Sequence, residues 1–197
     1  MIFTNPAARM RVGRVDGMPA PLDRPAIDHA VETAQTPPAR LILVLAAVQA
    51  LLPVQMRQLL LSDVDLGQRR LRVGNQDRPL DDVTRSALER YLAFRRQRWP
   101  NTANPYLLVT QQTAHSTAPA SSWWFKRMFR GQPATLKRLQ QDRFLEELQA
   151  VGPDPLHVAA VFGVHAITAN RYADALRSRI EQAAAAMEQT RQADSST

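Results

Sequence analysis

The chain contains no cysteine among its 197 residues. This absence excludes a disulfide scaffold, thiolate catalysis and a cysteine-ligated zinc site. Long apolar runs are missing too, because the longest run spans residues 41–54 and includes Gln49 and Pro53. A transmembrane helix needs about 20 apolar residues, and no secretory leader is recognised. We therefore expect a cytoplasmic protein with no membrane partner.

Lysine is scarce as well. The chain has 25 basic and 18 acidic side chains, a formal net charge of +7, and Lys126 and Lys137 are its only lysines. The planar arginine side chain suits bidentate contacts to phosphate and guanine. A pI near 10.9 favours a polyanionic partner, of which nucleic acid is the leading class. The alternative is that the arginine excess reflects GC-rich coding.

Metal and hydrolase motifs are also lacking. The four histidines lie at positions 29, 115, 157 and 165, so no pair has the i, i+4 spacing of a helical zinc site. The chain has no Gly-x-Ser-x-Gly nucleophile elbow and no glycine-rich phosphate loop. We therefore expect neither a metal nor a cofactor.

Aromatic residues make up only 6% of the chain, and the densest cluster runs from Trp123 to Phe125. We expect this cluster in the core or at an interface rather than as a platform for stacked bases. Basic residues gather near the end of the expected helix over 81–98, where cations favour the helix dipole. They are predicted to form a solvated face and are Arg90, Arg95, Arg96 and Arg98.

Proline content and apolar periodicity divide the chain into three parts. Residues 1–38 contain six prolines and predict a weakly ordered lead-in, in which only 26–34 could form a short helix. Residues 39–187 form the predicted domain, and 188–197 a disordered tail. The domain is predicted to be mainly α with a small antiparallel β-sheet. Helices are expected over 39–51, 54–61, 81–98, 120–130, 134–150, 154–162 and 166–187, and strands over 70–73, 77–80 and 106–109.

The segment from Leu156 to Tyr172 has the pattern of a helix-turn-helix. Gly163 would open the turn, four residues after the small Ala159 at the helix crossing. An ordinary helix pair with a glycine turn explains the pattern equally well. The packing residues would be Val158, Phe162, Ala169 and Tyr172, and the outward residues, able to meet base edges or phosphates, would be Thr168, Asn170 and Arg171.

Three segments resemble the catalytic motifs of tyrosine recombinases and phage integrases. Residues 50–66 are similar to the first motif, a helix pair that ends in Ser-Asp-Val-Asp before a small sheet. Residues 139–143 resemble the second motif, and residues 162–172 resemble the third motif with its nucleophilic tyrosine. The resemblance covers residues 39–180 and implies the α+β fold of that family's catalytic domain, without the N-terminal helical domain of the family.

The resemblance implies a role in DNA integration and recombination. In this family a tyrosine hydroxyl attacks a DNA phosphodiester and forms a covalent phosphotyrosine, with no nucleotide cofactor. Two arginines and a histidine or tryptophan neutralise the transition state, and a lysine on the small sheet helps to protonate the leaving oxygen.

This chain keeps little of that catalytic set. Tyr172 stands at the nucleophile position, but Leu52 and Gln140 stand where the family has its two arginines. The sheet lysine has no match, and the candidate remnants are Lys137, at the second-motif histidine, and His165, next to the third-motif position. Strand cleavage is therefore expected to be absent or feeble. The expected DNA-binding residues are Arg57, Arg138, Arg143, Thr168, Asn170 and Arg171.

Three hypotheses remain open from the sequence. The leading one is a DNA-binding protein of the tyrosine recombinase type with impaired catalysis, whose partners are double-stranded DNA and either a second copy of itself or a complete recombinase. The first alternative is a non-catalytic helix-turn-helix regulator that binds DNA. The second alternative is an interaction protein or a decayed fragment without DNA binding.

Overall fold

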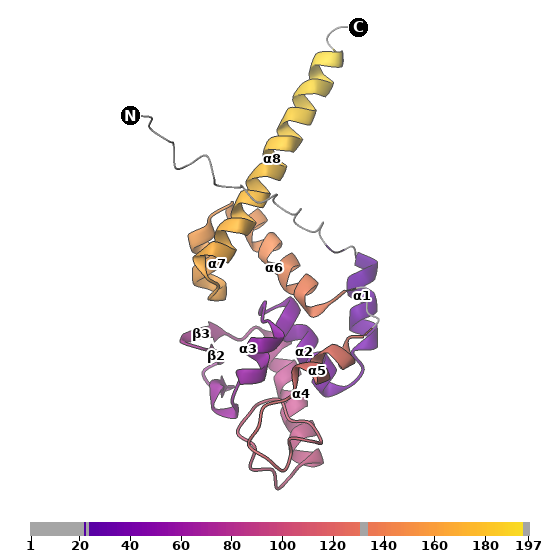
Figure 1. The fold of residues 1–197 in the computed structure, drawn as a ribbon, viewed down its shortest axis with the longest axis vertical. Helices are drawn as coiled ribbons and strands as arrows, with labels where there is room; N and C mark the ends of the chain where they lie inside the picture. Colours follow the sequence, from indigo (N-terminus) through magenta and orange to yellow (C-terminus); the bar gives the residue numbers. More distant parts are fainter. Residues whose placement is uncertain (1–21, 23, 131–133, 195–197) are drawn as a thin grey trace, which may run out of the picture.

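The computed structural model describes residues 22, 24–130 and 134–194. In Figure 1 the helices α6, α7 and α8 lie at one end of the molecule, and α4 and α5 lie at the other. The helices are α1 (Arg24–Thr33), α2 (Pro37–Ala47), α3 (Pro53–Gln58), α4 (Asp82–Arg98), α5 (Ser122–Met128), α6 (Leu136–Val151), α7 (Pro155–Phe162) and α8 (Ala166–Asp194), with a short 3-10 turn η2 (Leu61–Asp63). The strands are β1 (Val64–Asp65), β2 (Arg70–Val73) and β3 (Gln76–Pro79).

Helix α2 is the centre of the main core. It begins at Pro37, where Thr36 caps it by accepting a hydrogen bond from the Ala39 backbone N–H, and a proline fits the first turn of a helix. Its apolar side chains are buried on nearly every face, and it packs against α4 and α6. The helix ends earlier than the sequence predicts, at Ala47, because the backbone at Ala50 is left-handed with φ 52°.

The small sheet is antiparallel, in the order β1-β2-β3. Leu71 pairs with Arg78 across β2 and β3, and the buried Leu71 and Val73 alternate with exposed residues. Gly74 makes the hairpin turn with a positive φ of 61°, which a glycine adopts without strain. The structure thus confirms the predicted mainly α fold with one small antiparallel sheet.

The prediction of a strand over 106–109 was wrong. Tyr106 forms only an isolated bridge with Leu60, and the Leu107 backbone N–H donates to the Leu59 carbonyl at 2.8 Å. The backbone pairing does not continue beyond this point. The Val109 backbone N–H instead donates to the hydroxyl of Tyr91 on α4 at 3.0 Å. The segment is apolar because it is buried against α4, not because it continues a sheet.

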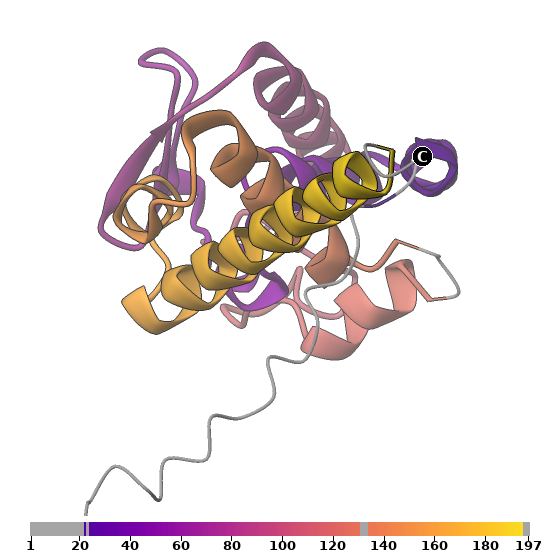
Figure 2. The same ribbon diagram turned by 90° about the horizontal axis from the view of Figure 1, so that it is seen from above.

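Both ends of the chain contribute helices. Helix α1 lies within the predicted lead-in, and Ala30 and Ala34 are buried in the core. Helix α8 continues to Asp194, beyond the end near residue 187 that the sequence predicts, and extends away from the body in Figure 1. In the view from above, α8 crosses in front of the body (Figure 2). Residues 1–21 and 195–197 lie outside the described residues, so the division into lead-in, domain and tail stays a prediction. Within the described part of the chain, no helix has the combined length and apolarity needed to cross a membrane.

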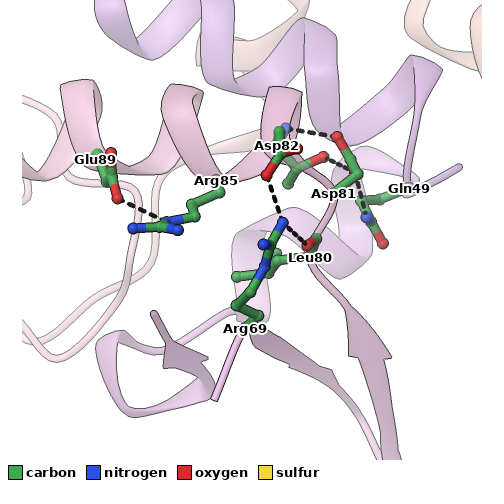
Figure 3. Close-up of polar contacts among 8 residues, drawn as sticks. Gln49, Arg69, Leu80, Asp81, Asp82, Arg85 and Glu89 are labelled. Atoms are coloured by element: carbon green, nitrogen blue, oxygen red, sulfur yellow. Dashed lines mark hydrogen bonds and ion pairs between the residues drawn. The ribbon is translucent and has the colours of Figure 1, made fainter. Parts of the chain in front are cut away.

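Asp81 caps α4 and links it to the end of α2 (Figure 3). Its carboxylate accepts hydrogen bonds from the backbone N–H of Thr84 at 2.8 Å, from the Thr84 hydroxyl at 2.5 Å and from the Gln49 amide at 3.2 Å. Burial by itself raises the pKa of Asp81, but these hydrogen bonds outweigh it and hold the pKa below its ordinary value. The neighbouring Asp82 is 87% exposed and forms only a surface ion pair with Arg69.

We expect the substitution Asp81→Ala to lower the free energy of unfolding by about 1–2 kcal/mol at neutral pH, because it removes a helix cap. A carboxyl with a depressed folded-state pKa stabilises the protein above its unfolded-state pKa, and this contribution is lost as pH falls through the folded-state pKa. The difference between wild type and variant should therefore shrink in acid. Urea unfolding from neutral to acid pH measures it, with Asp82→Ala as the control. Equal effects of the two substitutions would contradict the capping role.

Candidate functional site

Helices α7 and α8 form a helix pair joined by a glycine turn. Gly163 ends α7 in the left-handed conformation, with φ 59° and ψ 34°. The predicted packing is confirmed, since four residues face a second buried cluster, namely Val158, Phe162, Ala169 and Tyr172. On the outer side, Thr168 is half-buried and Asn170 and Arg171 are exposed.

Tyr172 is a packing residue in this arrangement. It is only 5% exposed, and its ring meets the ring of Phe144 edge-on, with centroids 5.3 Å apart. Phe144 in turn contacts Phe162, with ring centroids 4.8 Å apart. The ring of Tyr172 therefore fills the space between α6 and the α7–α8 pair.

The two positions expected to carry arginine have structural contacts of their own. Gln140 on α6 is 4% exposed, and its amide donates to the carbonyl of Ala50 at 2.9 Å. Leu52 precedes α3, and its backbone N–H donates to the Gln55 side chain at 2.9 Å. Gln140 thus satisfies the carbonyl of the left-handed residue that ends the α2 region, while Leu52 offers only a hydrocarbon side chain.

The β2–β3 hairpin is fastened to the end of α7. Arg78 on β3 is 5% exposed and donates to the Gln49 carbonyl at 2.6 Å and to the Phe162 carbonyl at 2.5 Å. The Gln76 amide donates to the Ala160 carbonyl at 3.1 Å. The last carbonyls of a helix lack intrahelical partners, so the two side chains satisfy them and place a cation at the α7 C-terminus. Burial lowers the pKa of Arg78 to about 10.

A cavity of about 620 Å³ opens between α3, this hairpin and the α7–α8 turn. Its walls are mostly uncharged, and the described residues that line it do not include Tyr172, Lys137 or His165. The structure therefore does not bring the predicted catalytic remnants together at this cavity. Its polar lining consists of Gln55, Gln58, Asp63, Asn75, Gln76 and Arg78.

Two of the predicted DNA-binding arginines are held by protein groups. Arg57 is half-buried, and its Nε donates to the Ala120 carbonyl at 2.6 Å. Arg143 pairs with Glu147 at 2.8 Å, and its guanidinium lies 5.5 Å from the ring centroid of Phe162. These contacts give both arginines structural roles, whatever else they bind.

The remaining predicted residues lie at separate places. Lys137 is exposed and Arg138 half-buried in the first turn of α6. His165 is exposed ahead of α8, and its backbone carbonyl accepts hydrogen bonds from Thr168 and Ala169. The described residues contain no group of three or more acidic or histidine side chains that could hold a metal ion.

Sequence reasoning missed the outer face of α5. Phe125 is 1% exposed and Trp124 packs edge-on against it, as expected for a core cluster. Trp123, in contrast, is 59% exposed, and the guanidinium of Arg127 lies 5.3 Å from its ring centroid. The outer face follows the spacing i, i+3, i+4, which places residues on one side of a helix. Its members are Trp123, Lys126 and Arg127, and the exposed Arg130 follows in the turn after the helix.

This face belongs to a stretch without acidic residues. Between Glu89 and Asp142 the sequence has 52 residues, nine of them basic and none acidic. These nine charges exceed the net charge of +7 of the whole chain, so the rest of the chain is slightly acidic. The long gap between acidic residues is visible in the sequence, and it is the signal from which this basic surface could have been predicted.

One arginine of this stretch corrects the sequence prediction of a solvated face. Arg95 is 7% exposed, and its Nη2 donates to the Asn104 carbonyl at 2.7 Å. Arg90, Arg96 and Arg98 are exposed as expected. Arg95 is buried because the loop after α4 folds back over the last turn of the helix.

No protein-family model matches the chain, and no curated protein matches it by sequence. Several solved structures share its fold. The XerA recombinase is 23% identical, with a TM-score of 0.64 over 84% of this chain and 65% of that one. The XerH site-specific recombinase bound to its difH substrate is 17% identical, with a TM-score of 0.62 over 87% of this chain and 54% of that one. The Tn1549 transposon integrase in complex with circular intermediate DNA is 14% identical, with a TM-score of 0.57 over 82% of this chain and 66% of that one.

The chain therefore has the fold of a tyrosine recombinase catalytic domain, as the sequence resemblance predicts. It spans less than two thirds of the length of each of these three structures.

Proposed function

We propose that the chain is a DNA-binding protein that acts in DNA integration or recombination and cleaves DNA strands feebly or not at all. The observation that carries this proposal is the occurrence of nine basic and no acidic residues, between Glu89 and Asp142, on a recombinase catalytic-domain fold. Such a concentration of one charge favours a polyanion. Two of the similar structures are complexes with DNA, which supports DNA as that polyanion.

The outer face of α5 is the surface that we assign to the DNA backbone. Lys126 and Arg127 are exposed there, and Arg130 is exposed in the turn that follows. These side chains can neutralise phosphates, releasing counterions in proportion to the number of contacts. This assignment adds to the predicted residues Arg138, Asn170 and Arg171, which remain candidates. Arg57 and Arg143 are weaker candidates because protein groups already engage them.

Impaired cleavage is proposed from the contacts of the substituted positions. Leu52 has no hydrogen-bond donor in its side chain, and the Gln140 amide donates to Ala50. The amide of Gln76 in the hairpin donates to Ala160. A transition-state oxyanion needs donors aimed at it, and these three positions lack the charged arginine and lysine donors of the family.

A helix-turn-helix regulator is the second candidate. The observation that favours it is the packing of α7 against α8, with Asn170 and Arg171 left exposed. Under this alternative, sequence preference depends on these two residues, because contacts to base edges carry specificity.

The test is fluorescence anisotropy of a labelled duplex titrated with the full chain across a salt series. We expect binding with a steep negative slope of log K on log salt, and Arg127→Gln should weaken binding about tenfold and reduce the slope by about 1. The matched control is Arg85→Gln, a partly exposed arginine of α4 that pairs with Glu89 at 2.9 Å outside the acid-free stretch.

The outcomes separate the candidates. Loss of sequence preference in an Asn170→Ala, Arg171→Gln variant, with Arg127→Gln neutral, would favour the regulator. Absence of binding at about 50 mM salt, where electrostatic binding is strong, would contradict both DNA hypotheses and favour an interaction protein.

A further inference from the structure

The connection between α4 and α5 is long and well ordered by internal contacts. It runs from Trp99 to Ser121 without a helix or a strand, and loops longer than about 12–15 residues in compact domains usually serve a function. Asn104 is 2% exposed and holds the loop together. Its amide donates to the carbonyls of Thr113 at 2.8 Å and Ala118 at 2.9 Å, and its oxygen accepts from the Tyr106 backbone N–H at 2.9 Å.

This loop and the end of α4 enclose a second cavity of about 280 Å³. Thr102 fixes its two walls together, because its hydroxyl donates to the Ala114 carbonyl at 2.6 Å. The aromatic wall is Trp99, whose ring is supported edge-on by Phe94, with centroids 5.7 Å apart. The polar groups that line the cavity are Arg98, Asn101, Thr102, Gln111 and His115.

The charge around this cavity favours an anion. It lies within the stretch that contains no acidic residue, and the guanidinium of Arg98 lies 5.7 Å from the Trp99 ring centroid. The C-terminus of α4 carries a partial negative charge, which basic residues in a last turn offset. That last turn contains Arg95, Arg96 and Arg98.

We propose that this cavity binds one nucleotide. Arg98 and His115 hold the phosphate, and the base lies against the Trp99 side with the amides of Asn101 and Gln111 available to its edge. A guanidinium binds phosphate through short charge-assisted hydrogen bonds, and aromatic rings stack on bases of any sequence. The volume is close to the lower limit of about 300 Å³ for ligand pockets, so it suits one nucleotide unit and not two. The unit is either a free mononucleotide or the 5′-phosphorylated end of a DNA strand.

Isothermal titration calorimetry of the full chain with AMP tests the site. We expect saturable binding that Arg98→Gln weakens about tenfold or more, and that His115→Gln weakens also. Arg96→Gln is the matched control, because Arg96 lies in the same helical turn and outside the lining of the cavity. Adenosine, which lacks the phosphate, should bind much more weakly than AMP. All three substituted residues are exposed, and circular dichroism verifies that the variants fold.

Trinucleotides with a 5′-phosphate or a 5′-hydroxyl distinguish a DNA end from a free mononucleotide as the ligand of this cavity. Preference for the phosphorylated trinucleotide, abolished by Arg98→Gln, assigns a DNA end, whereas binding of AMP alone assigns a free nucleotide. Absence of saturable AMP binding up to about 10 mM would overturn the proposal, as would equal losses in Arg96→Gln and Arg98→Gln. Arg127→Gln should leave AMP binding unchanged, so failure of this site and failure of duplex binding are distinguishable.

Discussion

A nicked suicide duplex incubated with the chain is expected to give no Tyr172-dependent covalent product above about 10⁻⁴ of the rate of a complete tyrosine recombinase. Losing one preorganised donor to a transition-state oxyanion costs about 10²–10³ in rate. Here two such donors are missing, at Leu52 and Gln140. Losses at residues that act together are not additive, so we take the smaller product of the two factors, about 10⁴, as the expected decrease.

The surroundings of the tyrosine reinforce this expectation. Tyr172 is 5% exposed and packs on Phe144, and it does not line the cavity beside the hairpin. A nucleophile must reach its phosphorus atom at an attack distance of about 3–3.5 Å. The duplex would therefore have to reach a ring that now belongs to the second buried cluster.

Two variants and a reference protein make the cleavage experiment decisive. Tyr172→Phe should match the wild type in both covalent yield and thermal stability, since the ring is kept. The double variant Leu52→Arg, Gln140→Arg tests whether restoring the two arginines is enough to restore cleavage. A complete recombinase on its own suicide duplex gives the reference yield. A covalent band of normal yield from the wild-type chain, absent in Tyr172→Phe, would refute the impairment.

The parts of the fold that were predictable have local patterns. Strand β2 alternates apolar and polar residues over Arg70–Val73, and Gly163 ends α7 before α8 begins. The apolar run at 106–109 misled because an apolar segment of four residues satisfies a strand and a buried loop equally. The hydroxyl of Tyr91, 18 residues before Val109, accepts the backbone hydrogen bond that a neighbouring strand would otherwise accept.

The candidate site was less predictable because its contacts connect distant residues. Arg78 joins Gln49 and Phe162, which are 29 and 84 positions away, and no local pattern marks a buried arginine. Arg95 was misassigned for the same reason, since its partner is a carbonyl in the following loop. The basic surface of α5 was different, because the absence of acidic residues between Glu89 and Asp142 is visible in the sequence.

Replacement of Arg78 is expected to have the largest effect on stability. Arg78→Leu should lower the free energy of unfolding by about 3 kcal/mol, because it leaves the buried carbonyls of Gln49 and Phe162 without their donor, and each costs about 1–3 kcal/mol. Urea unfolding at neutral pH measures the loss. Arg72→Leu is the control, since Arg72 lies on the neighbouring strand and forms an exposed pair with Asp77, and it should have almost no effect.

The expected loss is a balance of two opposing contributions. Burial lowers the pKa of Arg78 to about 10, so keeping this side chain charged in the folded state costs stability at neutral pH. For a base with a lowered folded-state pKa, the cost is present below about pH 10 and is relieved as pH rises above it. Leucine removes this cost but also removes both hydrogen bonds, and we expect the hydrogen bonds to dominate because they join three separate elements. A gain in stability for Arg78→Leu would show that the cost of desolvation dominates, as it does in some buried ion pairs. The attachment of α7 to the hairpin would then depend on Gln76 and on the second buried cluster.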